Sequence, residues 1–477
     1  MQTKAIIATI GLVVGGILGP VARAGTSLPP RLDPGALEGP SPRAIALFSH
    51  EIGDRDIERL AAAGVTHAAV FEAIDSVAIL GSDDAYIEVA RWSDVERVHQ
   101  DAPITFNNYI ARSDTRVDDV RAGKAPLRTG YTGKGVTVAV LDSGVDTSHP
   151  DFSNVAANIN MEPSWFMDDI SDGQYSQTSA EQPIGTDEVG HGTHVAGIVG
   201  GTGAAGVNVD QSGVAPGASL VNCKIVGAEA LPSSLGVNHA LIDQAFESNA
   251  LACYDWILDH RDDPRFPGGI RVVSNSWGFS APLSDPPGAL VLMLREVVAK
   301  GVSVAFSAGN GGPGDNTVNQ YPAAMEEVIT VGATCKSNST STTCEPGGIA
   351  DFSSRGEEVD VVAPGRTVWS ARAKSVSGSI PQTFLVLAGE RPGAPDDVSA
   401  TRNLAWYTAG SGTSMAVPHV AGIVALMIEA NPTLTPARIE ELLTRTATDR
   451  GELGFDHDYG FGLVNALAAV RAAERAR

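Results

Sequence analysis

Runs of apolar and β-branched residues recur along the chain from about residue 130, with polar or helix-like stretches between them. A run of this kind bounded by turn residues is typical of a strand that is buried on both faces. We expect six such strands, at residues 135–141, 219–226, 270–274, 302–307, 328–332 and 359–363. Helix-like stretches such as 238–259 and 288–300 lie between them. This alternation predicts an α/β fold with a mainly parallel twisted sheet and helices on both faces.

Another apolar run directly follows Ser414 and continues to Met427. Because both faces of a helix over this run would be apolar, we expect a buried helix, with Pro418 in its first turn. Ser414 would then lie at the N-terminal end, where free backbone N–H groups favour a developing anion. Taken alone, the stretch fits equally well an ordinary serine cap before a core helix.

Residues 44–106 have the pattern of a smaller unit of strand, helix, two strands, helix and strand. Its helix-like stretches are 54–63 and 86–99, with a last short strand near Ile104, and the order predicts a small α+β ferredoxin-like domain. A Pro/Gly-rich linker at 25–43 precedes it, and a polar connection at 107–129 leads to the large domain at 130–477. Two long polar stretches, near 160–187 and 371–404, are predicted to be surface insertions.

The first 24 residues have the pattern of a secretion signal. Lys4 is followed by an apolar stretch to Val21 and by Ala22-Arg23-Ala24, a small-x-small cleavage pattern. We favour cleavage after Ala24 over an N-terminal membrane anchor, and therefore expect a secreted, extracellular protein without a membrane partner.

Composition adds two constraints. The chain has 33 basic and 56 acidic residues, a net charge of −23, which argues against nucleic acid as a partner. It has four cysteines, an even number in an exported chain. A bridge between Cys335 and Cys344 would close a short polar loop, whereas Cys223 and Cys253 could be bonded or simply buried. We expect a monomer.

Three polar residues are candidates for a catalytic site at the carboxyl ends of the predicted strands. Asp142 ends the first predicted strand, and carboxyl ends of parallel strands share one edge of the sheet. His191 lies between two glycines at the start of a small-residue helix, which leaves room for close approach. A serine hydroxyl becomes a good nucleophile when an imidazole takes its proton and a carboxylate orients that imidazole. Asp142, His191 and Ser414 are therefore a candidate triad.

The segments around these residues resemble the subtilisin-like serine peptidases, the subtilase family. They read VAVLDSGVD at 138–146, HGTHVAG at 191–197 and GTSMAVPH at 412–419, in the chain order of that family. The resemblance covers about residues 131–466. It implies a serine endopeptidase that needs no cofactor, in which Asp142 orients, His191 is the general base and acid, and Ser414 attacks.

The resemblance also implies further site residues. VAFSAGNG at 304–311 is similar to the segment that supplies an oxyanion donor, here Asn310, although Asn-Gly alone often only closes a turn. The walls of the substrate pocket, which would take protein or peptide substrates, would be Ser276, Trp277, Gly278, Ser307, Ala308 and Gly309. Trp277 could instead be a simple core aromatic.

Two other features depend on the resemblance. Asp151 corresponds to a calcium ligand in some subtilases, but the loop at 200–212 lacks the usual pattern, so a structural calcium is only a hypothesis. The domain at 44–106 has the place and length of a subtilase propeptide, which acts as an intramolecular inhibitor and is removed by self-processing.

Two rival functions remain. A different serine hydrolase, such as an esterase, often carries Gly-x-Ser-x-Gly with the serine first in chain order, unlike this chain. A catalytically silent binding module would normally lack a triad residue, and none is missing.

Overall fold

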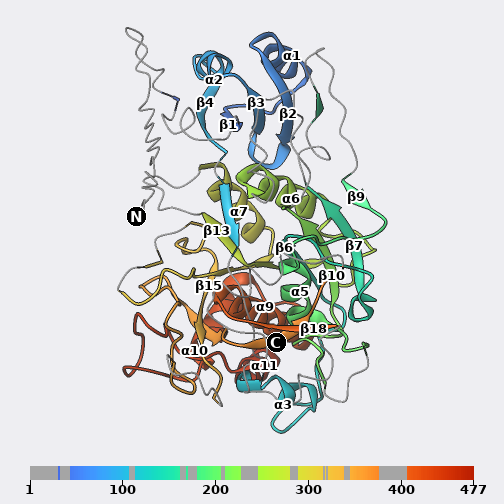
Figure 1. The fold of residues 1–477 in the computed structure, drawn as a ribbon, viewed down its shortest axis with the longest axis vertical. Helices are drawn as coiled ribbons and strands as arrows, with labels where there is room; N and C mark the ends of the chain where they lie inside the picture. Colours follow the sequence, from blue (N-terminus) through green and yellow to red (C-terminus); the bar gives the residue numbers. More distant parts are fainter. Residues whose placement is uncertain are drawn as a thin grey trace, which may run out of the picture.

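The computed structural model describes residues 31–32, 43–101, 103–106, 113–161, 168–169, 180–205, 210–226, 245–279, 288–314, 317–318, 321–337, 344–374 and 406–476. The predicted signal segment and most of both predicted insertions lie outside these residues. The described chain forms a small N-terminal domain stacked on a larger one (Figure 1).

The larger domain is built on an eight-stranded sheet with the order β16-β15-β14-β12-β6-β10-β7-β9. Every neighbouring pair is parallel except β7 and β9. The strands are β6 (Thr137–Asp142), β7 (Val155–Asn160), β9 (Glu181–Gln182), β10 (Ser219–Lys224), β12 (Ile270–Asn275), β14 (Ser303–Ser307), β15 (Ile329–Thr334) and β16 (Val361–Pro364). The predicted parallel α/β sheet is confirmed, and all six predicted strands are present.

Helices cover both faces of this sheet. One face carries α5 (His191–Gly200) and α9 (Thr413–Ala430), with α10 (Pro436–Thr446) and α11 (Ala466–Arg475) outside them; the other carries α6 (Glu247–His260) and α7 (Gly288–Ala299). Side chains of β6 alternate between the two cores: Val138 and Val140 pack with α5 and α9, and Leu141 packs with α6 and α7. The helix predicted at 238–259 begins only at Glu247 in the described chain, after the two-residue strand β11 (Ala245–Phe246).

Helix α9 runs through the centre of the fold. Its length and composition would suffice to cross a membrane, but 94% of that window is buried inside the described structure, so it is a core helix. The prediction for Pro418 is wrong, because Pro418 is the sixth residue of α9 rather than a first-turn residue. A proline there removes one backbone hydrogen bond from the helix.

The N-terminal domain is an antiparallel sheet with the order β4-β1-β3-β2-β8 and two helices. Its elements are β1 (Arg43–Phe48), α1 (Asp54–Ala62), β2 (Val65–Phe71), β3 (Ser76–Gly81), α2 (Asp83–Val89) and β4 (Val95–Gln100), and β8 (Asp168–Asp169) comes from the larger domain. The predicted order of elements is correct, but the second helix ends at Val89 instead of residue 99. A turn containing Ser93 and Asp94 interrupts it and is followed by β4. The strand predicted near Ile104 is present as β5 (Pro103–Phe106), but it pairs with β11 and β13 (Trp277–Phe279) instead of joining this sheet.

The N-terminal sheet is apolar on both faces. Ala44 and Ala46 of β1 face the domain's own helices, whereas Ile45 and Leu47 share a core with α6 and α7. Figure 1 shows α6 and α7 directly beneath this sheet.

Polar contacts add to the apolar interface between the domains. His99 Nε2 lies 3.2 Å from Glu247 Oε2, with both side chains almost fully buried. The backbone N–H of Ser248, in the first turn of α6, donates to Asp101 at 2.6 Å. A carboxylate at the N-terminal end of a helix is favoured by the helix dipole.

Both candidate disulfides are formed. Cys335–Cys344 closes the short polar loop as predicted, and Cys223–Cys253 joins β10 to α6, which answers the question left open for that pair.

Asp255 of α6 gives a pH-dependent prediction for this interface. Burial, followed by repulsion from Asp259, raises its pKa from 3.8 to about 7, and Glu72 of the N-terminal domain adds to the repulsion. A carboxyl whose folded pKa is raised costs stability as pH rises from about 4 to about 7. In a Ser414→Ala background, Asp255→Asn should therefore raise the Tm, with a gain that grows over this window and levels off above it.

The measurement is Tm against pH for the two proteins. Glu58→Gln, an exposed change on α1, is the control and should give no such trend. A Tm gain from Asp255→Asn that stays constant from pH 4 to pH 8 would contradict the assignment.

Candidate active site

Asp142 and His191 form a buried pair. Asp142 is the last residue of β6, and His191 is the first residue of α5. His191 Nδ1 lies 2.6 Å from Asp142 Oδ1, and each side chain is 1% exposed. The backbone N–H of Ser143 also donates to Oδ1, while Oδ2 receives no hydrogen bond from the described residues. The carboxylate therefore binds Nδ1 and fixes the orientation of the ring.

A glycine contact allows this close approach. A Cβ on Gly192 would lie 2.0 Å from the carbonyl oxygen of Gly144. A larger residue would fit at this position only if the His191 helix moved away from the loop after Asp142. The absence of a side chain at Gly192 therefore allows the close approach that the sequence predicts.

Asp187 is a site residue that sequence reasoning missed. Its carboxylate accepts hydrogen bonds from the Ser143 hydroxyl (2.9 Å), from the Thr193 hydroxyl (2.6 Å) and from the backbone N–H groups of residues 189, 190 and 193. Burial raises its pKa to about 6, although these hydrogen bonds oppose the rise. Asp187 thus ties the first turn of α5 to the residue that follows Asp142.

Ser414 is fully buried in the first turn of α9. Its hydroxyl donates to the Ser276 carbonyl at 3.0 Å, and the Ser276 hydroxyl donates back to the Ser414 carbonyl at 2.6 Å. In an uninterrupted helix the Ser414 carbonyl would accept from the residue four positions later, which here is Pro418 and has no N–H. The missing helical bond leaves this carbonyl open to Ser276.

Ser276 connects Ser414 to the Asp142–His191 pair. It directly follows β12, which pairs in parallel with β6, and Asn275 is the partner of Leu141. Ser276 and Asp142 therefore stand side by side at the carboxyl edge of the sheet, and the structure brings the three candidate triad residues to that edge.

Asn310 follows β14 at the same edge. Its side-chain oxygen accepts from both the backbone N–H and the hydroxyl of Thr413, each at 3.0 Å. The Thr413 hydroxyl in turn accepts from the backbone N–H of Gly309. The side-chain oxygen therefore caps α9, on a residue that is partly exposed. Asn310 thus lies beside the start of the Ser414 helix, and the donor role of its amide nitrogen stays a prediction.

The predicted substrate walls lie on either side of this point. Residues 307–309 are buried at the end of β14, and the Trp277 ring is fully buried, in edge-to-face contact with Phe306. The alternative of a core aromatic therefore holds for the Trp277 side chain. Its backbone belongs to β13 (Trp277–Phe279), which pairs antiparallel with β5 (Pro103–Phe106) of the N-terminal region.

Comparison with known proteins agrees with this geometry. Residues 133–462 match the model of the subtilase family. The chain is 33% identical to subtilisin E of Bacillus subtilis (strain 168) over 355 residues, 73% of this chain and 69% of that protein. It is 30% identical to M-protease of Shouchella clausii (strain KSM-K16), covering 79% of this chain and 77% of that protein.

The chain belongs to the subtilase family. It is a subtilisin-like serine peptidase. Among solved structures it is similar to fervidolysin from Fervidobacterium pennivorans, a keratinolytic enzyme related to subtilisin, with a TM-score of 0.61 and 24% identity. That match covers 90% of this chain and 60% of fervidolysin, and it supports the fold alone.

The Asp151 carboxylate is engaged by protein donors in this subtilase. One carboxylate oxygen accepts from the Tyr407 hydroxyl at 2.8 Å, and the other accepts from the backbone N–H of Ala205 at 2.9 Å. Both oxygens accept hydrogen bonds from neutral donors, and a calcium site, which takes six to eight oxygen ligands, stays a hypothesis for this carboxylate.

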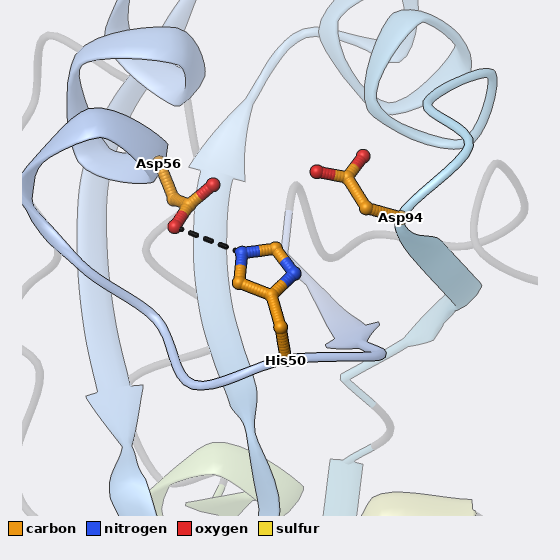
Figure 2. Close-up of side chains that lie close together, drawn as sticks. All are labelled: His50, Asp56 and Asp94. Carbon is orange, nitrogen blue, oxygen red and sulfur yellow. Dashed lines mark hydrogen bonds and ion pairs between the residues drawn. The ribbon is translucent and has the colours of Figure 1, made fainter.

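One group of potential metal ligands occurs in the described chain, formed by His50, Asp56 and Asp94 of the N-terminal domain (Figure 2). Arg59 donates to Asp94 at 2.6 Å and to Asp56 at 3.1 Å. One guanidinium therefore bridges both carboxylates, and His50 also contacts Asp56 at 3.1 Å, so these side chains form an ion-pair network.

The Asp187 contacts predict a positioning role for this residue. Asp187→Ala should lower kcat of the processed subtilase by about 10- to 100-fold with little change in KM, because a misplaced base costs rate rather than ground-state binding. The measurement is steady-state hydrolysis of a chromogenic peptide, made well below the Tm of each variant. Glu188→Gln, which changes the neighbouring half-exposed acid, should leave kcat within about twofold. An Asp187→Ala enzyme with raised KM and unchanged kcat would contradict the role.

Proposed function

We propose that this subtilase is a secreted endopeptidase, made with an N-terminal inhibitory domain that it removes itself. The observation that carries the catalytic part is the buried Asp142–His191 pair at the sheet edge where Ser414 lies.

The chemistry follows from that pair. His191 Nε2 takes the Ser414 proton as Oγ attacks the carbonyl carbon, and Asp142 stabilises the imidazolium. The tetrahedral intermediate collapses as His191 returns the proton to the leaving amine, leaving an acyl-enzyme. Water, deprotonated by His191, then attacks the ester and releases Ser414. Before the first step the Ser414 hydroxyl must rotate from the Ser276 carbonyl toward His191.

The oxyanion would be held by two donors. These are the Asn310 side-chain nitrogen and the backbone N–H of Ser414, which has no acceptor within the first turn of its helix. Capping by Asn310 Oδ1 keeps the amide in position before substrate arrives, so no reorganisation is needed in the transition state.

Asn310→Ala should lower kcat by about 10²- to 10³-fold, the loss known for removal of one such donor from a subtilisin. KM should change little, because the donor acts on charge that develops only in the transition state. Asn310→Ala also removes the α9 cap, whereas Thr413→Val keeps Asn310 and removes the contacts of the Thr413 hydroxyl with Asn310 Oδ1 and with the Gly309 N–H. Equal loss of kcat in both variants would assign the effect to capping and contradict the oxyanion role.

The position of β5 supports an inhibitory role for the N-terminal domain. β5 pairs antiparallel with β13 on one side and with β11 on the other. A peptide substrate of an enzyme with this architecture would add to the same edge through its main chain. The N-terminal region therefore competes with substrate for β13 while its sheet rests on α6 and α7.

The strand register predicts the processing site. Phe106 is the partner of Trp277, and a strand continued in this register reaches the position opposite Ser276 one residue later. Ser276 is hydrogen-bonded to Ser414, so we predict cleavage after Asn107 and a processed chain that starts at Asn108. Ser414→Ala should leave the chain uncleaved. N-terminal sequencing and mass measurement of the purified proteins check both points.

Ser411→Ala is the matched control, and it should still be processed and still react at Ser414 with a fluorophosphonate probe. Spontaneous cleavage of purified Ser414→Ala would overturn self-processing without affecting the catalytic proposal. Absence of probe labelling in the processed protein would overturn the catalytic proposal itself. Recovery of the processed form from the culture medium of an expressing host tests secretion.

A further inference from the structure

A cavity of about 580 Å³ lies between α3 (Val117–Arg121), α10 and α11. Figure 1 shows these helices at the end of the molecule opposite α1 and α2. The cavity is therefore separate from the sheet edge that carries Ser414 and from the surface covered by the N-terminal domain.

Five arginines line this cavity, and no acidic residue is among its lining residues. They are Arg116, Arg438, Arg445, Arg471 and Arg475. Such a cluster is unexpected in a chain with a net charge of −23, because acidic partners are abundant. Like charges held at close range destabilise the fold unless something neutralises them.

The neighbouring acids neutralise only part of the cluster. Glu441 pairs with both Arg438 and Arg445, and Asp119 pairs with Arg116. Arg471 and Arg475 have no ion-pair partner in the described part of the chain. The cluster therefore keeps an excess of positive charge that points to an external anion.

Two details favour a ligand over simple surface charge. Arg471 Nε is shielded from solvent and donates to no acceptor in the described residues, although a buried donor normally has a partner. Glu474, the acidic neighbour on α11, is turned inward, where it accepts from the Tyr131 hydroxyl at 2.6 Å and from the Arg128 N–H at 3.1 Å. The helix thus presents its arginines to the cavity and its acid to the core.

We propose that this arginine cavity binds a compact anion with two or more oxyanion groups. Planar guanidinium groups bind phosphate and carboxylate through paired N–H donors, and arginines from separate helices can hold several such groups at once. The apolar parts of the lining, such as Leu442 and Leu467, limit the site to a small ligand or a short acidic segment. The anion could be a free oligophosphate or the carboxylates of a polypeptide.

The test uses the full chain with Ser414→Ala, which prevents self-digestion, and calorimetric titration with tripolyphosphate at low salt. We expect saturable binding that weakens as NaCl is raised. Arg471→Gln/Arg475→Gln should weaken Kd by at least about tenfold, because each charge-assisted hydrogen bond contributes at least that order of affinity. Arg438→Gln/Arg445→Gln, two exposed changes, should do the same and covers the case in which the first pair disturbs folding.

The matched control is Arg91→Gln/Arg295→Gln, which removes the same charge from exposed arginines elsewhere. It should change Kd by less than about twofold. Equal weakening by control and cavity variants, absence of saturable binding, or equal affinity for orthophosphate would each overturn the proposal. A hexaglutamate peptide distinguishes the sources: cavity-dependent binding of this peptide assigns the site to acidic polypeptide, and binding of tripolyphosphate alone assigns it to a free anion.

Discussion

The structure depends on keeping a carboxylate and an imidazole paired out of water. Asp142 and His191 are almost fully buried, and a buried charge is tolerated only when it is paired and hydrogen-bonded. The pair joins the end of a strand to the start of a helix, so any shift of α5 against β6 would separate the two. The glycine contact between residues 144 and 192 and the Asp187 carboxylate both hold that junction closed.

Three further side chains hold the site together by forming hydrogen bonds with backbone groups that the helices leave without a partner. Asn310 caps α9, Ser276 takes the carbonyl that Pro418 leaves without a donor, and Asp187 caps α5. Each of these side chains forms a hydrogen bond with an unpaired backbone group of a helix, and that bond also fixes the orientation of the side chain at the sheet edge. Structural capping and site geometry are therefore served by one set of contacts.

The sequence predicted the features that local pattern encodes. Six buried strands follow from continuous apolar runs, and the three motif segments gave the candidate triad before any contact was known. The sequence does not reveal β7, which lies next to the edge strand β9, because half-exposed residues interrupt its apolar pattern. It does not reveal the turn at Ser93 and Asp94 because that turn is short. Asp187 could not be recognised, since its role depends on Ser143, 44 residues earlier. Ser276 and Ser414 are 138 residues apart, and their mutual contact depends on a proline four residues beyond Ser414.

The contact between the domains combines a favourable contribution from apolar burial with an unfavourable one from buried carboxyl groups. Apolar residues of β1 and β2 share a core with α6 and α7, and that burial favours docking. The same contact buries Glu247 and Asp255, and desolvation raises the pKa of both carboxyls. Withdrawal of the N-terminal sheet would return these groups toward water and remove the Glu72 charge. Docking is therefore strong through its apolar area but carries an electrostatic cost that grows with pH. The proposed departure of this domain after folding would be helped by an interface of this mixed kind, because its buried carboxyls oppose docking more strongly as the pH rises.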